Sequence, residues 1–277
     1  MTLPDRAALG TMHGKAAAIA PPLARIGITL VVPDGLDTDR FGTFTAEIPR
    51  VGTMEDAARA KARAAIAATG LPVGLASEGA YGPHPFIPFL PVGREVLLWR
   101  NENTGQEVIE RLTDDAPCFD HLTVASPDEA TPFLTRIGFP RTAVIVAPAG
   151  ALPLAKGLQD RAAVDDAIRR AMDQSGQGEA VLQTDMRAHL NPRRMETIAR
   201  LAERLATRLA TPCPACAAPG WGLVRREPGL PCAWCDGPTL MIKAEVDGCT
   251  LCGHEAHRSR PNGPDTADPS HCPDCNP

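Results

Sequence analysis

Four Cys-x-x-Cys pairs close this chain, and their spacing constrains its fold more than any other feature of the sequence. They comprise eight of the nine cysteines: Cys213 and Cys216, Cys232 and Cys235, Cys249 and Cys252, and Cys272 and Cys275. Two intervening residues let both thiolates of a pair, here called a knuckle, face one ion, and two knuckles complete a tetrahedral zinc site. The sequence therefore predicts two structural Zn²⁺ ions, with sequential and cross-braced pairing of the knuckles both open.

The segment that holds the knuckles, residues 211–277, cannot build an ordinary hydrophobic core. Eleven of its 67 residues are proline and few are large and apolar, so metal binding must supply its folding free energy. His254 and His271 each stand next to a knuckle. Because eight cysteines already offer eight ligands, we expect both histidines to lie outside the zinc coordination.

Charge and cysteine chemistry restrict the partners and the compartment. The segment carries five lysines and arginines against eight aspartates and glutamates, and each zinc with four thiolates adds two negative charges. Such a surface repels phosphate backbones, so we expect no nucleic-acid partner and consider a protein partner instead. Knuckles bind metal in a reducing compartment, and no stretch of about twenty apolar residues is present, so we expect a cytoplasmic protein without membrane contact.

Residues 1–210 are predicted to form an α/β domain, and residues 211–277 a small zinc-ribbon-like module. The last helix before the boundary begins after Asn191, its N-cap, and has an apolar stripe from Met195 to Leu209. Strand and helix patterns alternate before it, which favours an α/β sandwich around a mixed sheet. Strands are expected at 6–11, 26–32, 73–76, 95–100, 107–112, 142–148 and 180–183, and helices from residue 14 and at 54–69, 128–137 and 162–172.

The turn after the first expected strand contains His13, Gly14 and Lys15. A strand that leads into a helix start directs backbone N–H groups, the helix dipole and a lysine at one point, which is a natural anion site. The alternative is an ordinary loop with a solvated lysine. Pro21 and Pro22 are expected to interrupt the helix that follows.

Two further segments offer carboxylates. Glu47 lies in a glycine-containing acidic segment that could hold Mg²⁺ beside a phosphate, or could simply be a solvated loop. Glu78 follows the expected strand 73–76, at the end where open α/β sheets place function, and His84 comes close behind. The alternative for this second segment is a structural loop stiffened by prolines, with His84 exposed.

A fourth segment places basic residues at the start of the Asn191 helix. Cations in a first turn oppose the helix dipole, so Arg187 and Arg193 would fit there as phosphate contacts. An Asp185–arginine pair that ties strand to helix is an equal alternative. Cys118, the remaining cysteine, is interpreted as a small buried hydrophobic residue rather than a nucleophile.

Taken in order, RAALGTMHGK, RIGITLVV and MEDAARAKARAAIAATGLPVGLASEG resemble the inosine triphosphatase (Ham1-like) superfamily of nucleoside-triphosphate pyrophosphatases over residues 1–80. The resemblance implies a Ham1-like fold for the first half and contacts of Lys15 and Lys61 with a triphosphate. It also implies a Mg²⁺ or Mn²⁺ ligand at Glu55, with Glu47 as its rival. Glu78 would then stand near the catalytic carboxylates.

Nearly the whole chain also resembles an uncharacterised bacterial family. The shared motifs are His13–Lys15, Asp37–Phe44, Ser77–Pro85, Asp185–Arg193 and Cys272–Pro277. That family has no assigned function, so this second resemblance implies no activity.

Together these features favour a metal-dependent phosphohydrolase or pyrophosphatase that acts on a nucleotide or a related phosphorylated small molecule. Lys15, Arg187 and Arg193 would hold phosphate, while Glu47 and Glu78 would hold Mg²⁺ and orient a water molecule. His84 would act as an acid–base group. The alternative function is that of a non-catalytic ligand-binding or adaptor protein whose zinc module docks a protein partner.

Overall fold

The computed structural model describes residues 2–42, 48–50, 52–259 and 263–276. The chain divides into two compact units. The α/β unit comprises Pro4–Asn103 and Ile109–Leu205, and the knuckle unit comprises Met1–Leu3, Thr104–Val108 and Ala206–Pro277. All four knuckles belong to the second of these units.

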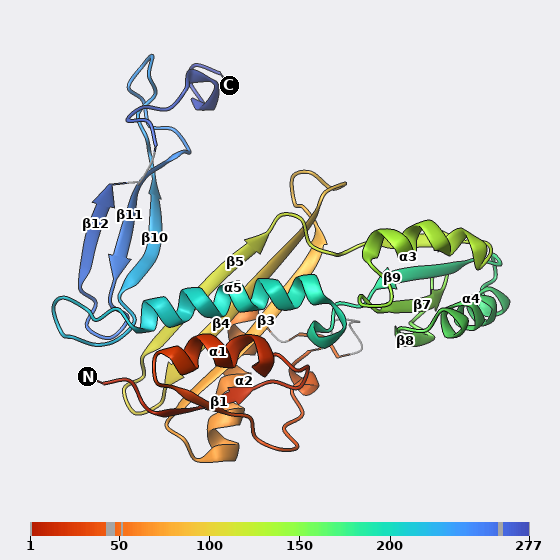
Figure 1. The fold of residues 1–277 in the computed structure, drawn as a ribbon. Helices are drawn as coiled ribbons and strands as arrows, with labels where there is room; N and C mark the ends of the chain where they lie inside the picture. The colour runs from red at the N-terminus through yellow and green to blue at the C-terminus, as the bar shows by residue number, and fades with distance from the viewer. Residues whose placement is uncertain (1, 43–47, 51, 260–262, 277) are drawn as a thin grey trace. The chain divides into compact units, whose positions relative to one another are not determined.

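The larger sheet of the α/β unit is mixed, with the strand order β2-β1-β3-β4-β5 (Figure 1). Strand β1 pairs in parallel with β2 and β3, whereas β3 and β4 form a long antiparallel hairpin. Strand β5 begins in the knuckle unit and continues into the α/β unit. The strands are β1 (Arg6–Gly10), β2 (Thr29–Val31), β3 (Val73–Pro83), β4 (Pro91–Asn101) and β5 (Glu107–Asp114).

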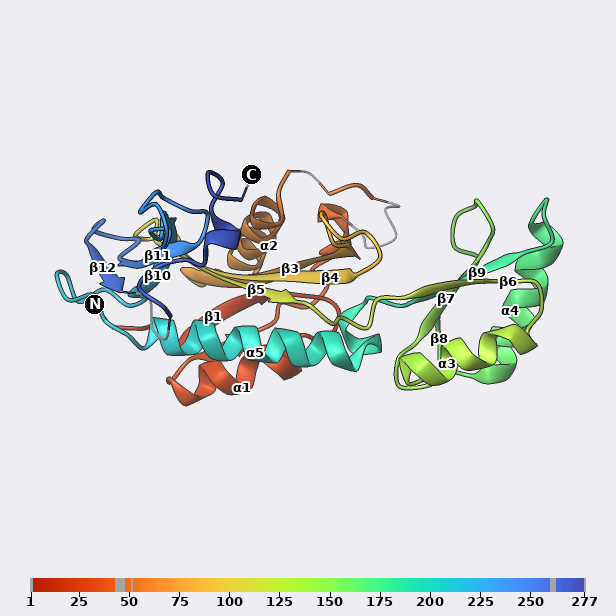
Figure 2. The same cartoon turned by 90° about the horizontal axis from the view of Figure 1, so that it is seen from above.

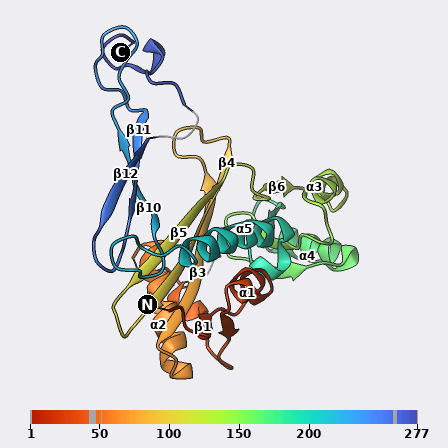
Figure 3. The same ribbon diagram turned by 60° about the vertical axis from the view of Figure 1, so that its left-hand side comes forward.

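Helices cover both faces of this sheet (Figure 2). Helix α2 (Met54–Thr69) packs Ala58 and Ala62 against Ala76, Val96 and Leu98 on one face. A Cβ at Gly74 would lie only 2.7 Å from the carbonyl oxygen of Ala62, so glycine permits this close approach. On the other face, α1 (Ala16–Arg25) lies beside α5 (Pro192–Leu209), and Arg25 forms an ion pair with Glu203 (Figure 3).

A second, antiparallel sheet of the α/β unit has the order β6-β9-β7-β8. Helices α3 (Thr131–Ile137) and α4 (Arg161–Gln174) pack on it, and Phe133, Val146 and Ile168 belong to the shared core. Its strands are β6 (His121–Val124), β7 (Val144–Pro148), β8 (Ala155–Leu158) and β9 (Ala180–Thr184).

The predicted mixed α/β class is confirmed, but the arrangement differs from the expectation of one mixed sheet. Strands β6 and β8 were not predicted, and they complete a separate sheet with β7 and β9. Helix α1 also continues through Pro21 and Pro22. Pro22 is buried together with Ile19 and Leu23, so packing of this face offsets the hydrogen bonds that the two prolines cannot donate.

The predicted starts of the helix at residue 54 and of the helix after Asn191 are confirmed. Thr53 caps α2 through a reciprocal capping box with Asp56, and the side-chain oxygen of Asn191 accepts from the backbone N–H of Arg194 at 3.1 Å. Strand β3, however, extends to Pro83 rather than ending near Ala76. Its continuation pairs residue by residue with β4, a long-range partner that no local signal reveals.

The knuckle unit contains a three-stranded antiparallel sheet of β10 (Gly222–Pro228), β11 (Ile242–Gly248) and β12 (Glu255–Ser259). The knuckles lie in the loops and turns around these strands. Among the helices that the structure describes, none combines the length and the apolar composition that crossing a membrane requires.

Candidate functional site

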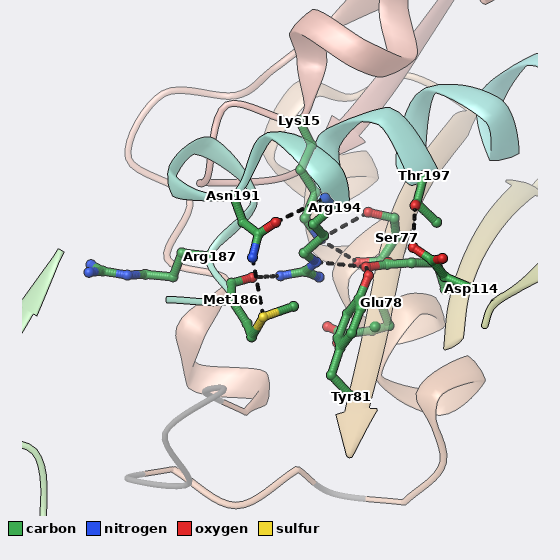
Figure 4. Close-up of polar contacts among 12 residues, drawn as sticks. Lys15, Ser77, Glu78, Tyr81, Asp114, Met186, Arg187, Asn191, Arg194 and Thr197 are labelled. Atoms are coloured by element: carbon green, nitrogen blue, oxygen red, sulfur yellow. Dashed lines mark hydrogen bonds and ion pairs between the residues drawn. The ribbon is translucent and has the colours of Figure 1, made fainter. Parts of the chain in front are cut away.

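Lys15 lies at the carboxyl end of β1, beside the part of β3 that no longer has β1 paired to it. Strand β1 ends at Gly10, opposite Ala76, while β3 continues beyond it. The turn from β1 brings Lys15 to the start of α1, and its Nζ atom donates to the carbonyl oxygen of Ser77 at 3.2 Å and to Ser77 Oγ at 3.0 Å (Figure 4). The lysine predicted to bind an anion is therefore buried, not solvated, with 7% of its surface exposed.

The charge of Lys15 is poorly compensated. Burial and, to a smaller extent, the nearby Arg194 lower the pKa of its ammonium group to about 8, against the opposing effects of Glu95 and Glu78. No carboxylate among the described residues forms an ion pair with Lys15, and both of its hydrogen-bond acceptors belong to the neutral Ser77. An ammonium group has three protons to donate, so these two contacts leave donor capacity.

A second buried cation, Arg194, lies on the same side of β3. Its Nε atom donates to Glu95 Oε1 at 2.7 Å, and its guanidinium also contacts the carbonyl oxygen of Met186. The hydroxyl of Tyr81 donates to the same oxygen of Glu95 at 2.8 Å. Gly79 stands directly opposite Glu95 in the strand register, and a Cβ there would lie 2.4 Å from Glu95 Oε1. Glycine at this position therefore makes room for the ion pair.

Glu78 lies on the opposite face of β3, within the strand and not at its end. It is 5% exposed, and its Oε1 atom pairs with Lys61 of α2. Arg50 approaches Glu78 Oε2 at 3.4 Å and donates to the carbonyl oxygen of Gly79 at 2.7 Å. The predicted position of Glu78 after the strand was wrong because β3 continues to Pro83.

The contacts around this part of β3 bring together more positive than negative charge. Figure 4 shows Lys15, Arg194 and Ser77 close together, with Arg187 extending away from them. The cations are Lys15, Arg50, Lys61 and Arg194, and the carboxylates are Glu78 and Glu95. An excess of cations at the carboxyl end of a parallel strand is an arrangement that suits an anionic ligand.

The basic residues predicted near the Asn191 helix form ion pairs. Arg187 chelates Asp185, with Nε to Oδ1 at 3.1 Å and a terminal nitrogen to Oδ2 at 2.6 Å. Arg193 donates to Asp114 at 2.9 Å, and burial of this carboxyl is outweighed by that contact, so the pKa of Asp114 is lowered. The structure thus contains the Asp185–arginine pair that the sequence left open as an alternative.

The remaining predicted site residues lie away from Lys15 or outside the description. Glu55, at the start of α2, pairs with Arg111 at 2.9 Å. His84 is in the β3–β4 loop, where its Nδ1 atom accepts from two backbone N–H groups at 3.2 Å. Along an extended strand it is separated from Glu78 by about 20 Å. Glu47 lies outside the described residues.

Arg194, Glu95 and Arg50 are site residues that sequence reasoning missed. Arg194 follows Arg193 directly in the first turn of α5, and helix position alone does not tell which of two adjacent arginines points to the sheet. Glu95 lies in the middle of β4, opposite Gly79. This pairing cannot be predicted without the register of the two strands. Arg50 precedes α2 in an irregular segment that carries no periodic pattern.

The knuckles assemble in a cross-braced order. Cys213 and Cys216 join Cys249 and Cys252, while Cys232 and Cys235 join Cys272 and Cys275, and all ligand atoms within each cluster lie within 4.8 Å of one another. Two sulfur–sulfur separations in each cluster lie between 3.7 and 3.9 Å. A tetrahedron with zinc–sulfur bonds of about 2.3 Å has edges of about 3.8 Å, so both clusters could hold zinc.

Each knuckle repeats the same backbone turn. The N–H group four residues after the first cysteine donates to the carbonyl of that cysteine at 2.9 to 3.0 Å, from Ala217, Asp236, Gly253 and Asn276. Ala217 and Asp236 adopt φ values of 57° and 58°, the left-handed region that non-glycine residues rarely enter. The shared knuckle turn therefore requires this backbone conformation even where the residue is not glycine.

The other sulfur and imidazole groups lie outside these four-cysteine clusters. Cys118 packs against the core of the second sheet, and burial raises the pKa of its thiol. His254 stacks on Trp221 with ring centroids 5.4 Å apart. These positions agree with a packing role for Cys118 and with His254 outside the coordination.

The fold and its clusters define the protein as an α/β protein with a cysteine-rich, zinc-type knuckle module. The family described as "Domain of unknown function (DUF6671)" matches residues 61–277, and the chain belongs to this family. That agrees with the resemblance to a family without an assigned function. The match includes Lys61, Glu78 and all four knuckles, while Lys15 precedes it. Neither a curated protein nor a solved structure matches the chain.

Proposed function

We propose that the α/β unit binds a phosphorylated small molecule at the carboxyl end of β1, with Lys15 as the main phosphate contact. The observation that carries the proposal is a buried ammonium group whose described hydrogen-bond acceptors are both neutral. Burying a charge without a counter-charge costs free energy. A bound anion would supply the missing charge and would restore the pKa of Lys15 toward its ordinary value of 10.5.

The start of α1 supports phosphate as the anionic group. Lys15 is the N-cap residue, and no side chain caps this end of the helix. The N–H groups of Ala17 and Ala18 already donate to the carbonyl oxygens of Gly14 and Lys15, so the helix dipole is what favours a negative charge at that position. Arg194 adds long-range positive potential, since it lowers the pKa of Lys15. These features favour a multiply charged anion over a simple carboxylate.

A finer form of the proposal is that the ligand is a nucleotide and that its phosphoanhydride is hydrolysed, as the pyrophosphatase resemblance implies. Catalytic Mg²⁺ or Mn²⁺ requires carboxylate oxygens that are available as ligands. Both oxygens of Glu78 contact cations, Lys61 and Arg50, and Glu55 pairs with Arg111. Among the described residues, these carboxylates therefore hold cationic side chains and do not form such a metal site.

The other predicted phosphate ligands already form ion pairs with carboxylates, so they are less available than Lys15. Lys61, Arg187 and Arg193 each hold a carboxylate, so each would have to exchange an ion pair for the ligand. Lys15 would only exchange neutral contacts with Ser77. We therefore assign the leading role to Lys15 and give the other three at most a supporting one.

A thermal-shift screen tests the proposal. Phosphorylated compounds, from inorganic pyrophosphate to nucleoside triphosphates and sugar phosphates, are added to the wild type, Lys15→Met and Lys243→Met. Lys243, an exposed lysine of β11, serves as the matched control. A ligand that binds only the folded state raises the melting temperature. At least one compound should stabilise the wild type and the control but not Lys15→Met.

Equal shifts in all three proteins, or no shift with any compound, would contradict the binding site. Compounds that do bind are then incubated with Mg²⁺ or Mn²⁺ and assayed for released phosphate and pyrophosphate, with Glu78→Gln as a second variant. Release that Glu78→Gln abolishes would support hydrolysis. Binding without release would leave a ligand-binding protein and would refute the hydrolase form.

A further inference from the structure

An exposed apolar surface surrounds the cluster formed by Cys232, Cys235, Cys272 and Cys275. We call residues 229–241 and 263–276 the second-cluster surface. Trp234, between two of the cysteines, is 78% exposed, and Leu240 is 86% exposed. A hollow of about 510 Å³ is lined by Leu240, Met241, His271 and Pro273, among others. Large apolar side chains this exposed are typical of places where a partner binds.

The charge of the second-cluster surface is negative throughout. Its four aspartates are exposed, and the same residues include no lysine or arginine: the aspartates are Asp236, Asp265, Asp268 and Asp274. No described cation forms an ion pair with any of the four. A zinc ion bound by four thiolates would add two more negative charges.

The neighbouring sheet of the knuckle unit has a different charge pattern. Its basic side chains are matched by acidic ones, as in the pairs of Arg225 with Glu255 and of Arg226 with Glu245. Arg258 likewise contacts Glu245 and Asp247. The uncompensated negative charge of the described knuckle unit is therefore concentrated around the second cluster.

We infer that the second-cluster surface docks a lysine- or arginine-rich segment of a partner protein. The hollow beside Leu240 would take an apolar side chain, and the exposed indole of Trp234 offers a face to a cation. The surrounding aspartates would attract basic residues and steer their approach. The inference uses only the knuckle unit and stands independently of phosphate binding by the α/β unit.

Charge argues against two other occupants. A nucleic acid would bring its phosphates to a surface without a lysine or arginine, which is unfavourable. A second copy of this chain carries a net charge of −5 and would bring like charge to the same surface. A basic protein segment is the occupant that supplies both the missing charge and the apolar contact.

Fluorescence anisotropy on the zinc-loaded 277-residue chain tests this inference. The probe is a short labelled peptide rich in lysine and arginine with a central leucine, and a second peptide replaces every basic residue by glutamate. The variants are Trp234→Ala, Asp236→Lys and Glu255→Lys. Glu255 lies at the start of β12, opposite Gly248 and next to the knuckle of Cys249 and Cys252, so its variant makes the same charge change away from the second cluster.

The basic peptide should bind the wild type and Glu255→Lys alike, and both Trp234→Ala and Asp236→Lys should weaken it about tenfold. The acidic peptide should not bind. Zinc content is measured for every variant, so that a lost cluster is not mistaken for a lost contact. Equal affinity for all variants, binding of the acidic peptide, or no binding of the basic one would overturn the inference.

Discussion

Lys15 carries a free-energy cost that a purely structural lysine would avoid. The difference between its ordinary pKa of 10.5 and a value of about 8 corresponds to roughly 3 kcal/mol against the charged form in the folded protein. Its two hydrogen bonds to Ser77 recover part of that cost. Binding sites often retain such destabilising groups because the ligand needs them.

Replacement of Lys15 by methionine should therefore raise the free energy of unfolding of the ligand-free protein by about 2 kcal/mol at pH 7. The folded pKa of Lys15 lies below its unfolded pKa, so the unfolded wild type binds more protons between pH 8 and 10.5. Wild-type stability should rise through that window, and the advantage of the variant should shrink. Urea unfolding in phosphate-free buffer at pH 7 and pH 10 measures both effects; a variant less stable at pH 7 would refute this account.

Gly79 should tolerate no side chain, since a Cβ would lie 2.4 Å from Glu95 Oε1. Gly79→Ala should lower the free energy of unfolding by about 2 kcal/mol because the Glu95–Arg194 pair must move. Gly82 of the same strand is the matched control, because a Cβ there meets no atom within 4 Å. Gly82→Ala should change stability by less than about 0.5 kcal/mol in the same denaturation experiment. Equal effects at the two glycines would show that the contact with Glu95 is unimportant.

The sequence pointed to individual residues where the chemistry is local. The turn His13-Gly14-Lys15 is predicted as an anion site because a strand, a glycine and a lysine follow one another directly, and this stays a prediction. Glu95 and Arg194, which are 99 residues apart, meet only because β4 pairs with β3 and α5 packs on the face of that sheet to which Glu95 points. A contact of this kind depends on tertiary packing, which residue patterns alone do not specify.

Helices and knuckles were predictable for the same reason. The capping box of Thr53 and Asp56 and the N-cap Asn191 act within one turn of chain. Strands β6 and β8 are four residues each and take their place from distant partners, as does the second half of β3. The spacing of the cysteines predicted four knuckles, while their cross-braced pairing depends on how β10 and β11 bring alternate knuckles together.

The cross-braced pairing can be tested by removing cysteines in pairs. Cys216 and Cys249 belong to one cluster, whereas Cys216 and Cys235 belong to different clusters. The double variant C216S/C249S should therefore retain one zinc per chain, and C216S/C235S should retain none, because a site with three thiolates binds zinc much more weakly. Elemental analysis after dialysis gives the stoichiometry. Sequential pairing would produce the opposite result.

The molecule as a whole consists of two compact units with different sources of stability. The α/β unit has cores between helices and sheets, as in the packing of α3 and α4 on the second sheet. The buried side chains around the first knuckle cluster are few, chiefly Cys213, Ala218 and Cys249. Metal coordination is therefore expected to stabilise the knuckle unit, and apolar burial the α/β unit.

Zinc removal should affect the two units differently. After EDTA treatment under reducing conditions, amide hydrogen exchange should become fast in β10, β11 and β12, and should change little in β7 and in helix α2. Exchange followed by mass spectrometry measures both units in one sample, and re-addition of zinc is the control. Uniform loss of protection across both units, or unchanged protection in the knuckle unit, would contradict separate sources of stability.

The claim that Lys15 exists to hold an anion is tested most directly by a crystal structure of the chain grown with inorganic pyrophosphate. We predict density for the anion within hydrogen-bonding distance of Lys15 Nζ, beside the first turn of α1, and no such density at this position in Lys15→Met. Wild-type crystals at saturating pyrophosphate in which Lys15 keeps only its contacts with Ser77, and any anion lies elsewhere, would contradict the claim.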